Sequence, residues 1–278
     1  MAIITFKDAD GEEHVLDTSQ RFNAAYHADC MEILRAMPDK CIDLIVADPP
    51  YGAGNAEDDT EHRNQRGRFD KYNDRSQIGN VERERERERP RRYNRFGSPG
   101  SRFEKYKRDA DGRDLGGEVR KKIIAWDVAP GKEVFDELFR VSREQIIWGG
   151  NYFSLPPTRC FLVWRKLSIS ESFTMAMAEY AWTSFNGNAK VFECAPQGKA
   201  SDPRFHPTAK PIDLYRWIYG MFTKPGMTVF DPFLGRGSSR IAAHEAGLNF
   251  IGCEIDPTYF AKEEERFERM TDNYSMFE

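Results

Sequence analysis

Short apolar runs recur along the chain, and each is followed by polar residues or glycine. They cover residues 42–47, 145–148, 160–164, 179–185, 227–230 and 250–253. Runs of this length that are rich in branched and aromatic side chains are typical of strands buried in a sheet. The runs at 160–164 and 179–185 follow each other with no long helix between them, which predicts an antiparallel pair at a sheet edge.

Between these runs, apolar side chains three and four residues apart predict amphipathic helices. Asp29 is placed to cap a short helix that ends before Pro38. Further helices are predicted at 132–141, 212–222 and 238–246. A helix that feeds a buried strand is the repeating unit of α/β sheets. We therefore expect an α/β fold in a single domain over residues 1–278.

The pattern stops after residue 54, and charged residues replace aliphatic ones up to residue 122. We therefore interpret residues 55–122 as an insertion. Residues 60–122 carry a net charge of +8, although the whole chain carries −4. In RPRRYNRF, arginines are interleaved with Tyr93 and Phe96. A basic segment of this kind is typical of a polyanion partner, and a solvated loop is the alternative.

Composition disfavours two other classes of protein. No apolar run approaches the roughly 18 residues of a membrane span, and the first residues, MAIITFKDAD, lack the basic and apolar blocks of a signal peptide. We therefore expect a cytoplasmic protein without membrane contact. The cysteines are odd in number and form no CxxC pair, so we predict reduced packing residues and neither a disulfide framework nor a metal site. They are Cys30, Cys41, Cys160, Cys194 and Cys253.

The predicted strand at 42–47 ends abruptly in DPPYG, residues 48–52. Proline has no N–H to donate, so the strand cannot continue and the chain must turn. An acid at the carboxyl end of a parallel strand lies where open α/β sheets place ligands. Asp48 is thus a candidate functional residue, although an ordinary strand-ending turn gives the same local pattern.

A second turn, DPFLGRGSS at residues 231–239, follows the strand at 227–230. Gly235 and Gly237 permit a tight backbone, and Glu254 ends the next strand, where an acid can accept ribose hydroxyls. The third glycine of a dinucleotide fingerprint is absent. Asp231 would repel a pyrophosphate but could receive the ammonium group of a methionine moiety. This favours S-adenosylmethionine over a dinucleotide.

Four motifs resemble, in sequence and in order, those of the β-class amino-methyltransferases of DNA. They are DPPYG, HPTAKP (206–211), DPFLGRGSS and GCEIDP (252–257). The resemblance spans residues 29–270 without the insertion. It implies a doubly wound, mostly parallel, seven-stranded Rossmann-like sheet with one antiparallel strand. It also implies S-adenosylmethionine as methyl donor and double-stranded DNA as substrate, with the target base flipped out of the helix.

The family also suggests a homodimer, a bacterial or phage-infected cell and a restriction–modification system. This chain departs from the family in two places. The usual cofactor loop is closer to FxGSGTT, whereas Arg236, Ser238 and Ser239 stand here. The long insertion follows DPPYG, while relatives often carry their variable region ahead of HPTxKP. No recognition residue can therefore be carried over.

The resemblance assigns roles to individual residues. The Asp48 carboxylate and the Pro49 carbonyl would each accept one hydrogen of the target amine, which localises the nitrogen lone pair. Tyr51 would offer its ring to the flipped base, and Lys210 would meet the carboxylate of the cofactor. The predicted catalytic residues are Asp48, Pro49, Pro50 and Tyr51. The predicted cofactor-binding residues are Asp48, His206, Thr208, Lys210, Asp231, Pro232, Phe233, Gly235, Gly237, Ser238 and Glu254.

Residues 60–122 are expected to be mobile in the free protein and to order over DNA. Their predicted phosphate contacts are Arg89, Arg91, Arg92 and Arg95. An aspartate at the first catalytic position is commoner among the adenine enzymes of the family, so we predict transfer to N6 of adenine. The alternatives are N4 of cytosine, a structured RNA or a protein glutamine, and a DNA-binding protein without catalysis.

Overall fold

The computed structural model describes residues 3–18, 20–52, 128–167, 169, 176–196, 202, 205–206 and 208–272. The chain divides into two compact units, one formed by Met1–Pro49 with Pro130–Glu278 and the other by Pro50–Ala129. The insertion and its four predicted phosphate contacts lie outside the described residues. The fold is therefore that of the first unit.

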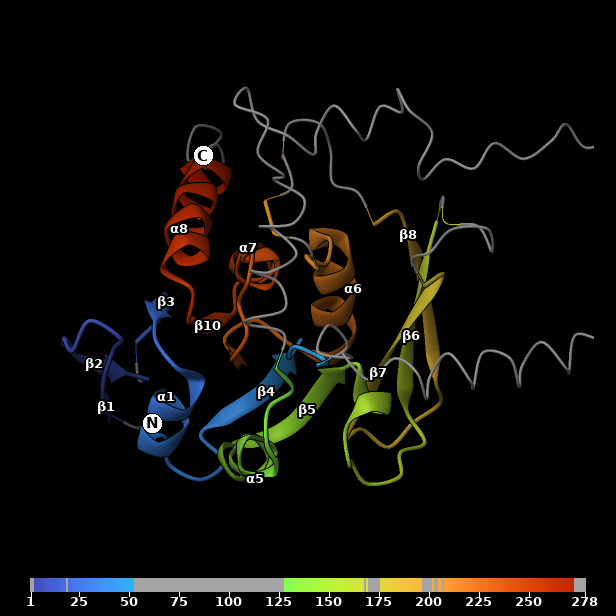
Figure 1. Ribbon diagram of the computed structural model, residues 1–278, viewed down its shortest axis with the longest axis horizontal. Helices are drawn as coiled ribbons and strands as arrows, with labels where there is room; N and C mark the ends of the chain where they lie inside the picture. The colour runs from blue at the N-terminus through green and yellow to red at the C-terminus, as the bar shows by residue number, and fades with distance from the viewer. Residues whose placement is uncertain are drawn as a thin grey trace, which may run out of the picture. The chain divides into compact units, whose positions relative to one another are not determined.

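A single large sheet forms the centre of this unit (Figure 1). Among the described residues it has eight strands, and their order across the sheet is β3 (Asn23–His27), β10 (Asn249–Glu254), β9 (Thr228–Asp231), β4 (Ile42–Ala47), β5 (Ser142–Trp148), β7 (Ala178–Thr183), β6 (Phe161–Lys166) and β8 (Lys190–Cys194). The strands from β3 to β5 pair in parallel. β7 is antiparallel to both neighbours, and β8 is parallel to β6.

The predicted fold class is confirmed by this arrangement, because the sheet is mostly parallel and β7 alone among its described strands runs against the others. The predicted antiparallel pairing of residues 160–164 with 179–185 was also correct, but β8 and not this pair forms the edge of the sheet. The strand number was wrong by one, since β8 extends the edge. The burial of β8 alternates between half-buried and exposed positions, so its sequence lacks the continuous apolar run of the central strands.

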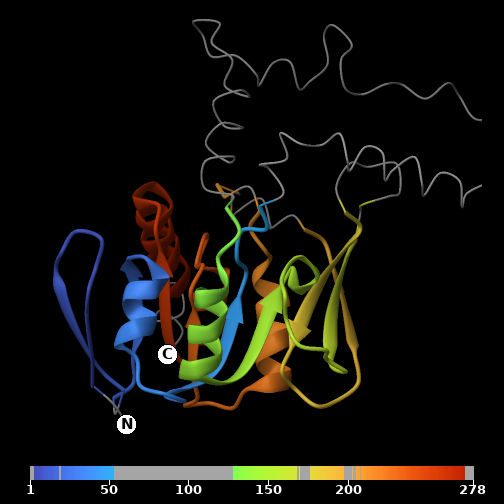
Figure 2. The same ribbon diagram turned by 60° about the horizontal axis from the view of Figure 1, so that its bottom comes forward.

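Helices cover both faces of the sheet (Figures 1 and 2). Their bounds are α1 (Cys30–Ala36), α5 (Lys132–Val141), α6 (Ile212–Phe222), α7 (Ser238–Glu245) and α8 (Pro257–Asp272). β4 shows how the two faces arise, because Ile45 and Ala47 join the core beneath α1 and α5, whereas Leu44 and Val46 join the core beneath α6 and α7. Successive side chains of a strand point to opposite faces, so one apolar run supplies both cores.

Several local predictions hold in detail. The Asp29 carboxylate accepts the Met31 N–H at 2.9 Å and caps α1, and α5 and α6 have the predicted bounds. The missed elements include α8, β3, β8 and a separate hairpin formed by β1 (Ile3–Lys7) and β2 (Glu13–Asp17). No described helix is long and apolar enough to cross a membrane.

The parallel strands bring their carboxyl ends to one edge of the sheet. Asp48 follows β4, Asp231 is the last residue of β9, and Glu254 is the last residue of β10. β9 lies between the other two strands. Three acids that are far apart in sequence therefore line the same edge, where open α/β sheets bind ligands.

Candidate active site

The Asp48 carboxylate is paired with a buried lysine. The Lys210 ammonium group forms an ion pair with Asp48 Oδ1, and the Lys210 side chain is only 2% exposed. Lys210 lies just before α6, in the HPTAKP segment, and Asp48 lies just after β4. A cation held against the acid favours the ionised carboxylate, which accepts hydrogen bonds and donates none.

Lys210 has a second acidic partner that the sequence did not indicate. Glu179, on β7, places Oε2 at 3.1 Å from the Lys210 ammonium nitrogen. Lys166, on the neighbouring strand β6, forms an ion pair with the same glutamate. Burial by itself lowers the pKa of Lys210, but Asp48 and Glu179 outweigh it and raise the pKa above its usual value. Lys210 is therefore a fixed positive charge at this edge.

Asp231 is almost completely buried, with 1% of its surface exposed. Its carboxylate accepts the Ser239 hydroxyl and, at 3.1 Å, the Phe233 N–H. Burial raises its pKa to about 7, and the negative charges of Asp48 and Glu254 also act to raise it. The ionised form is thus disfavoured by burial. A positively charged ligand group at this position would stabilise it.

Hydrogen bonds of Glu254 connect the turn after β9 with the end of β10. One carboxylate oxygen accepts the Gly235 N–H at 2.8 Å, and the other accepts the Asp256 N–H at 2.9 Å. Burial raises the pKa of Glu254 above its usual value. Each carboxylate oxygen has two lone pairs, so Glu254 can still accept hydroxyl groups from a ligand.

The two glycines of the loop are required for different reasons. Both have the left-handed conformation, with φ of 55° at Gly235 and 72° at Gly237. A Cβ at Gly237 would overlap the carboxylate of Glu263 on α8, so this glycine serves the packing of α8. Among the described residues, a Cβ at Gly235 would meet no atom closer than the His206 ring at 3.6 Å. Close approach of a ligand to the backbone is thus possible at Gly235.

Of the remaining predicted site residues, those of the first unit include members of this loop and of the HPTAKP segment. His206 stacks edge-on against Tyr259 with ring centroids 4.5 Å apart, and Thr208 Oγ1 lies 3.4 Å from His206 Nδ1. The Pro232 carbonyl accepts the Cys253 thiol at 3.4 Å, Phe233 is half-buried and Ser238 is buried. Pro50 and Tyr51 belong to the second unit. Their roles toward a base stay predictions.

Arg236, which stands where the usual family loop has another residue, contacts other side chains of this chain. Its guanidinium lies 2.5 Å from the Asp202 carboxylate and 5.5 Å from the Phe205 ring centroid. Arg266 of α8 donates to the same carboxylate at 2.8 and 2.9 Å and to the Arg236 carbonyl at 2.6 Å. These contacts connect the segment before HPTAKP with the cofactor loop and with α8. The sequence did not predict these contacts, because no local motif indicates them.

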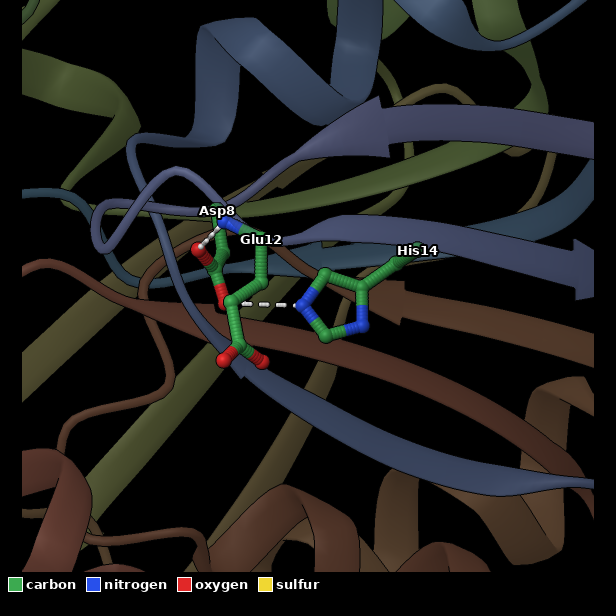
Figure 3. Close-up of side chains that lie close together, drawn as sticks. All are labelled: Asp8, Glu12 and His14. Carbon is green, nitrogen blue, oxygen red and sulfur yellow. Dashed lines mark hydrogen bonds and ion pairs between the residues drawn. The ribbon is translucent and has the colours of Figure 1, made fainter.

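A separate cluster of possible metal ligands lies at the hairpin of β1 and β2 (Figure 3). The ligand atoms of Asp8, Glu12 and His14 lie within 4.8 Å of one another. Asp8 already accepts the Asp10 and Glu12 N–H groups at 3.0 and 2.8 Å and pairs with His14 Nε2 at 2.7 Å. These bonds account for the arrangement, so we assign no metal site there.

Comparison with known proteins adds independent information. The sequence model of N6 and N4 methyltransferases, described as DNA methylase, matches residues 124–265, just over half of the chain. The chain is 24% identical over 266 residues to the Type II methyltransferase M2.MboI of Moraxella bovis, with 88% of each protein covered. YubD of Escherichia coli (strain K12), provisionally assigned as a methylase, is 38% identical over 68 residues, which are 24% of this chain and 30% of YubD.

The structure is also similar to solved structures. One is the complex of M1.HpyAVI with SAM, which has a TM-score of 0.46 and 17% identity and covers 87% of this chain and 97% of that chain.

Proposed function

Because the chain belongs to the family of DNA methylases that includes N6 and N4 methyltransferases, we propose that it transfers a methyl group from S-adenosylmethionine to N6 of adenine in double-stranded DNA. The observation that carries this proposal is the Asp48–Lys210 ion pair at the carboxyl edge of the sheet. It supplies an ionised acceptor where the family motif requires one.

The groups at the ends of β9 and β10 fit the proposed methyl donor. When bound, S-adenosylmethionine supplies a methyl group on a sulfonium centre. Asp231, a buried carboxylate with a raised pKa, suits the ammonium group of its methionine moiety. Glu254 is placed by two backbone N–H groups and suits its ribose hydroxyls. Both assignments rest on the chemistry of the residues present.

The catalytic role of the turn follows from the electronic structure of the target. The lone pair of an exocyclic amine is delocalised into the base, so the amine is a weak nucleophile. The Asp48 carboxylate accepts one N–H hydrogen and the Pro49 carbonyl accepts the other, which directs the lone pair toward the methyl group. As the N–C bond forms and the S–C bond breaks, nitrogen must lose one proton. The Asp48 carboxylate is the neighbouring base that can accept it.

The choice of adenine rests on Asp48, since an aspartate at this position is commoner among the adenine enzymes of the family. Cytosine N4 is the second candidate, because the family includes both activities. Contacts of the insertion with DNA, a homodimer, a cytoplasmic location and a role in restriction–modification stay predictions.

The test is to incubate the protein with tritiated donor and unmethylated double-stranded DNA and then to analyse the nucleosides. Labelled N6-methyladenine supports the proposal. Label found only in N4-methylcytosine would make cytosine the target base. In parallel incubations, label found in RNA or protein while the DNA stays unlabelled would overturn the substrate class.

Asp48→Ala should reduce transfer by at least ~100-fold, because it removes the acceptor that activates the amine. Donor affinity, measured by calorimetry, should change little. Asp43→Ala offers a matched control, since Asp43 lies on the same strand but not at its carboxyl end. There its carboxylate accepts the Thr228 N–H at 2.9 Å. Equal turnover by Asp48→Ala and the parent protein would contradict the catalytic role.

A further inference from the structure

A row of alternating charges ends at Asp48, the first residue of the proposed catalytic turn. In order, it consists of Lys166, Glu179, Lys210 and Asp48, each ion-paired with the next. Their side chains are 7%, 22%, 2% and 15% exposed, respectively. Two positive and two negative charges make the row neutral. It starts on the strands β6 and β7 and ends at the carboxyl group that faces the target amine in the proposed function.

The row is not needed to form the sheet. β6 and β7 are joined by backbone pairing over five residue pairs, from Phe161↔Trp182 to Arg165↔Ala178, and by the Lys166 N–H donating to the Met177 carbonyl at 2.8 Å. Buried ion pairs also add little net stability, because desolvation offsets their attraction, and apolar residues of similar volume often replace them without loss. The strands therefore give no reason for buried charges at these positions.

The geometry explains what Glu179 does for Lys210. An ammonium group has three N–H donors and a flexible stem, so a single partner does not fix its position. Lys210 has Asp48 on one side, Glu179 on another, and the Trp148 ring at 5.2 Å from its nitrogen. Glu179 is itself fixed by its place in β7 and by Lys166. Contacts with side chains of the sheet thus fix the position of the Lys210 ammonium group.

From this arrangement we propose that Glu179 is a positioning residue, which holds the Lys210 ammonium so that the Asp48 carboxylate stays aimed at the target amine. The inference rests on the proposed function of Asp48. Without the Glu179 charge, Lys210 retains Asp48 as its acidic partner in the row but is no longer held toward β7, so the ammonium group shifts and moves the carboxylate paired with it. The carboxylate is then displaced from the target amine, so the chemical step slows while donor binding at the ends of β9 and β10 is preserved.

The central test is Glu179→Gln, which keeps the shape of the side chain and removes its charge. We expect kcat at saturating donor and DNA to fall by ~10- to 100-fold, as for a small misplacement of a reacting group. We expect the donor Kd to change less than kcat, because Asp231 and Glu254, at the ends of β9 and β10, are untouched by the substitution. Glu193→Gln is the matched control, because Glu193 pairs with Arg165 at 2.6 Å on the same part of the sheet but is exposed.

The double variant Lys166→Met/Glu179→Gln separates positioning from charge balance. If Glu179 merely neutralises Lys166, removing both charges returns kcat to the parent value, and this result would overturn the proposal. If Glu179 positions Lys210, the double variant stays as slow as Glu179→Gln. The double variant leaves no uncompensated Lys166, so it also serves where Glu179→Gln alone fails to fold.

A measurement without turnover distinguishes failure of this inference from failure of the proposed function. In ¹H–¹⁵N spectra of lysine ammonium groups, the Lys210 signal, assigned with Lys210→Met, should be protected from exchange in the parent protein and in Glu193→Gln. It should broaden or shift in Glu179→Gln. An unchanged signal refutes positioning by Glu179, even if the parent protein methylates no DNA. A changed signal together with an inactive parent supports the positioning and refutes the function.

Discussion

At the scale of single residues, Asp231 links burial to ligand binding. Burial raises its pKa from the ordinary 3.8 to about 7. In the free protein the folded state therefore binds more protons than the unfolded state between these values, so Asp231 costs stability as pH rises through this window. A bound ammonium group reverses the preference, because it requires the ionised carboxylate. Donor affinity should then increase from pH 5.5 to pH 7, by at most about 10-fold per pH unit.

Calorimetric titrations with S-adenosylmethionine at these pH values measure the effect, and the ammonium group of the donor stays charged throughout the range. Asp231→Asn should bind the donor weakly and without this pH dependence. Glu254 also has a raised pKa and faces the same loop, so the slope that disappears in Asp231→Asn is the part due to Asp231. A parent protein whose affinity is independent of pH contradicts the assignment of the ammonium group to Asp231.

At the scale of elements, the loop between β9 and α7 is shaped from behind by α8. Gly237 and Gly235 both have positive φ, so alanine at either position costs about 1–2 kcal/mol of backbone strain. At Gly237 the added Cβ also overlaps Glu263 on α8, which adds about 1–3 kcal/mol of overpacking. Gly237→Ala should therefore lower the free energy of unfolding in urea more than Gly235→Ala. Gly235→Ala should weaken donor binding more than its smaller loss of stability implies. Equal destabilisation by the two variants would show that α8 does not constrain the loop.

At the scale of the whole molecule, the distribution of charge is uneven. Residues 60–122 carry a net charge of +8 in a chain of net charge −4. If the predicted phosphate contacts are made, changing Arg89, Arg91, Arg92 and Arg95 to alanine should weaken binding to every DNA sequence. It should also flatten the dependence of log K on log salt by up to about 0.9 per lost contact. Binding measured by fluorescence anisotropy at several salt concentrations tests this, with equal slopes for variant and parent as the contradicting result.

The sequence by itself determined the central strands, their ends and the helices between them. Apolar runs and helical spacing are local properties, and they gave β4, α5 and α6 nearly residue by residue. Because the acids Asp48, Asp231 and Glu254 come directly at strand ends, their common edge followed from a parallel sheet.

The tertiary structure decided which charges meet. Lys210 lies 162 residues from Asp48 in the chain, and its pairing with Glu179 depends on the order of β4, β5 and β7 across the sheet. The role of Gly237 likewise depends on the packing of α8. A buried charge is stabilised by whatever partner the fold brings within reach, and no local pattern of residues encodes that partner.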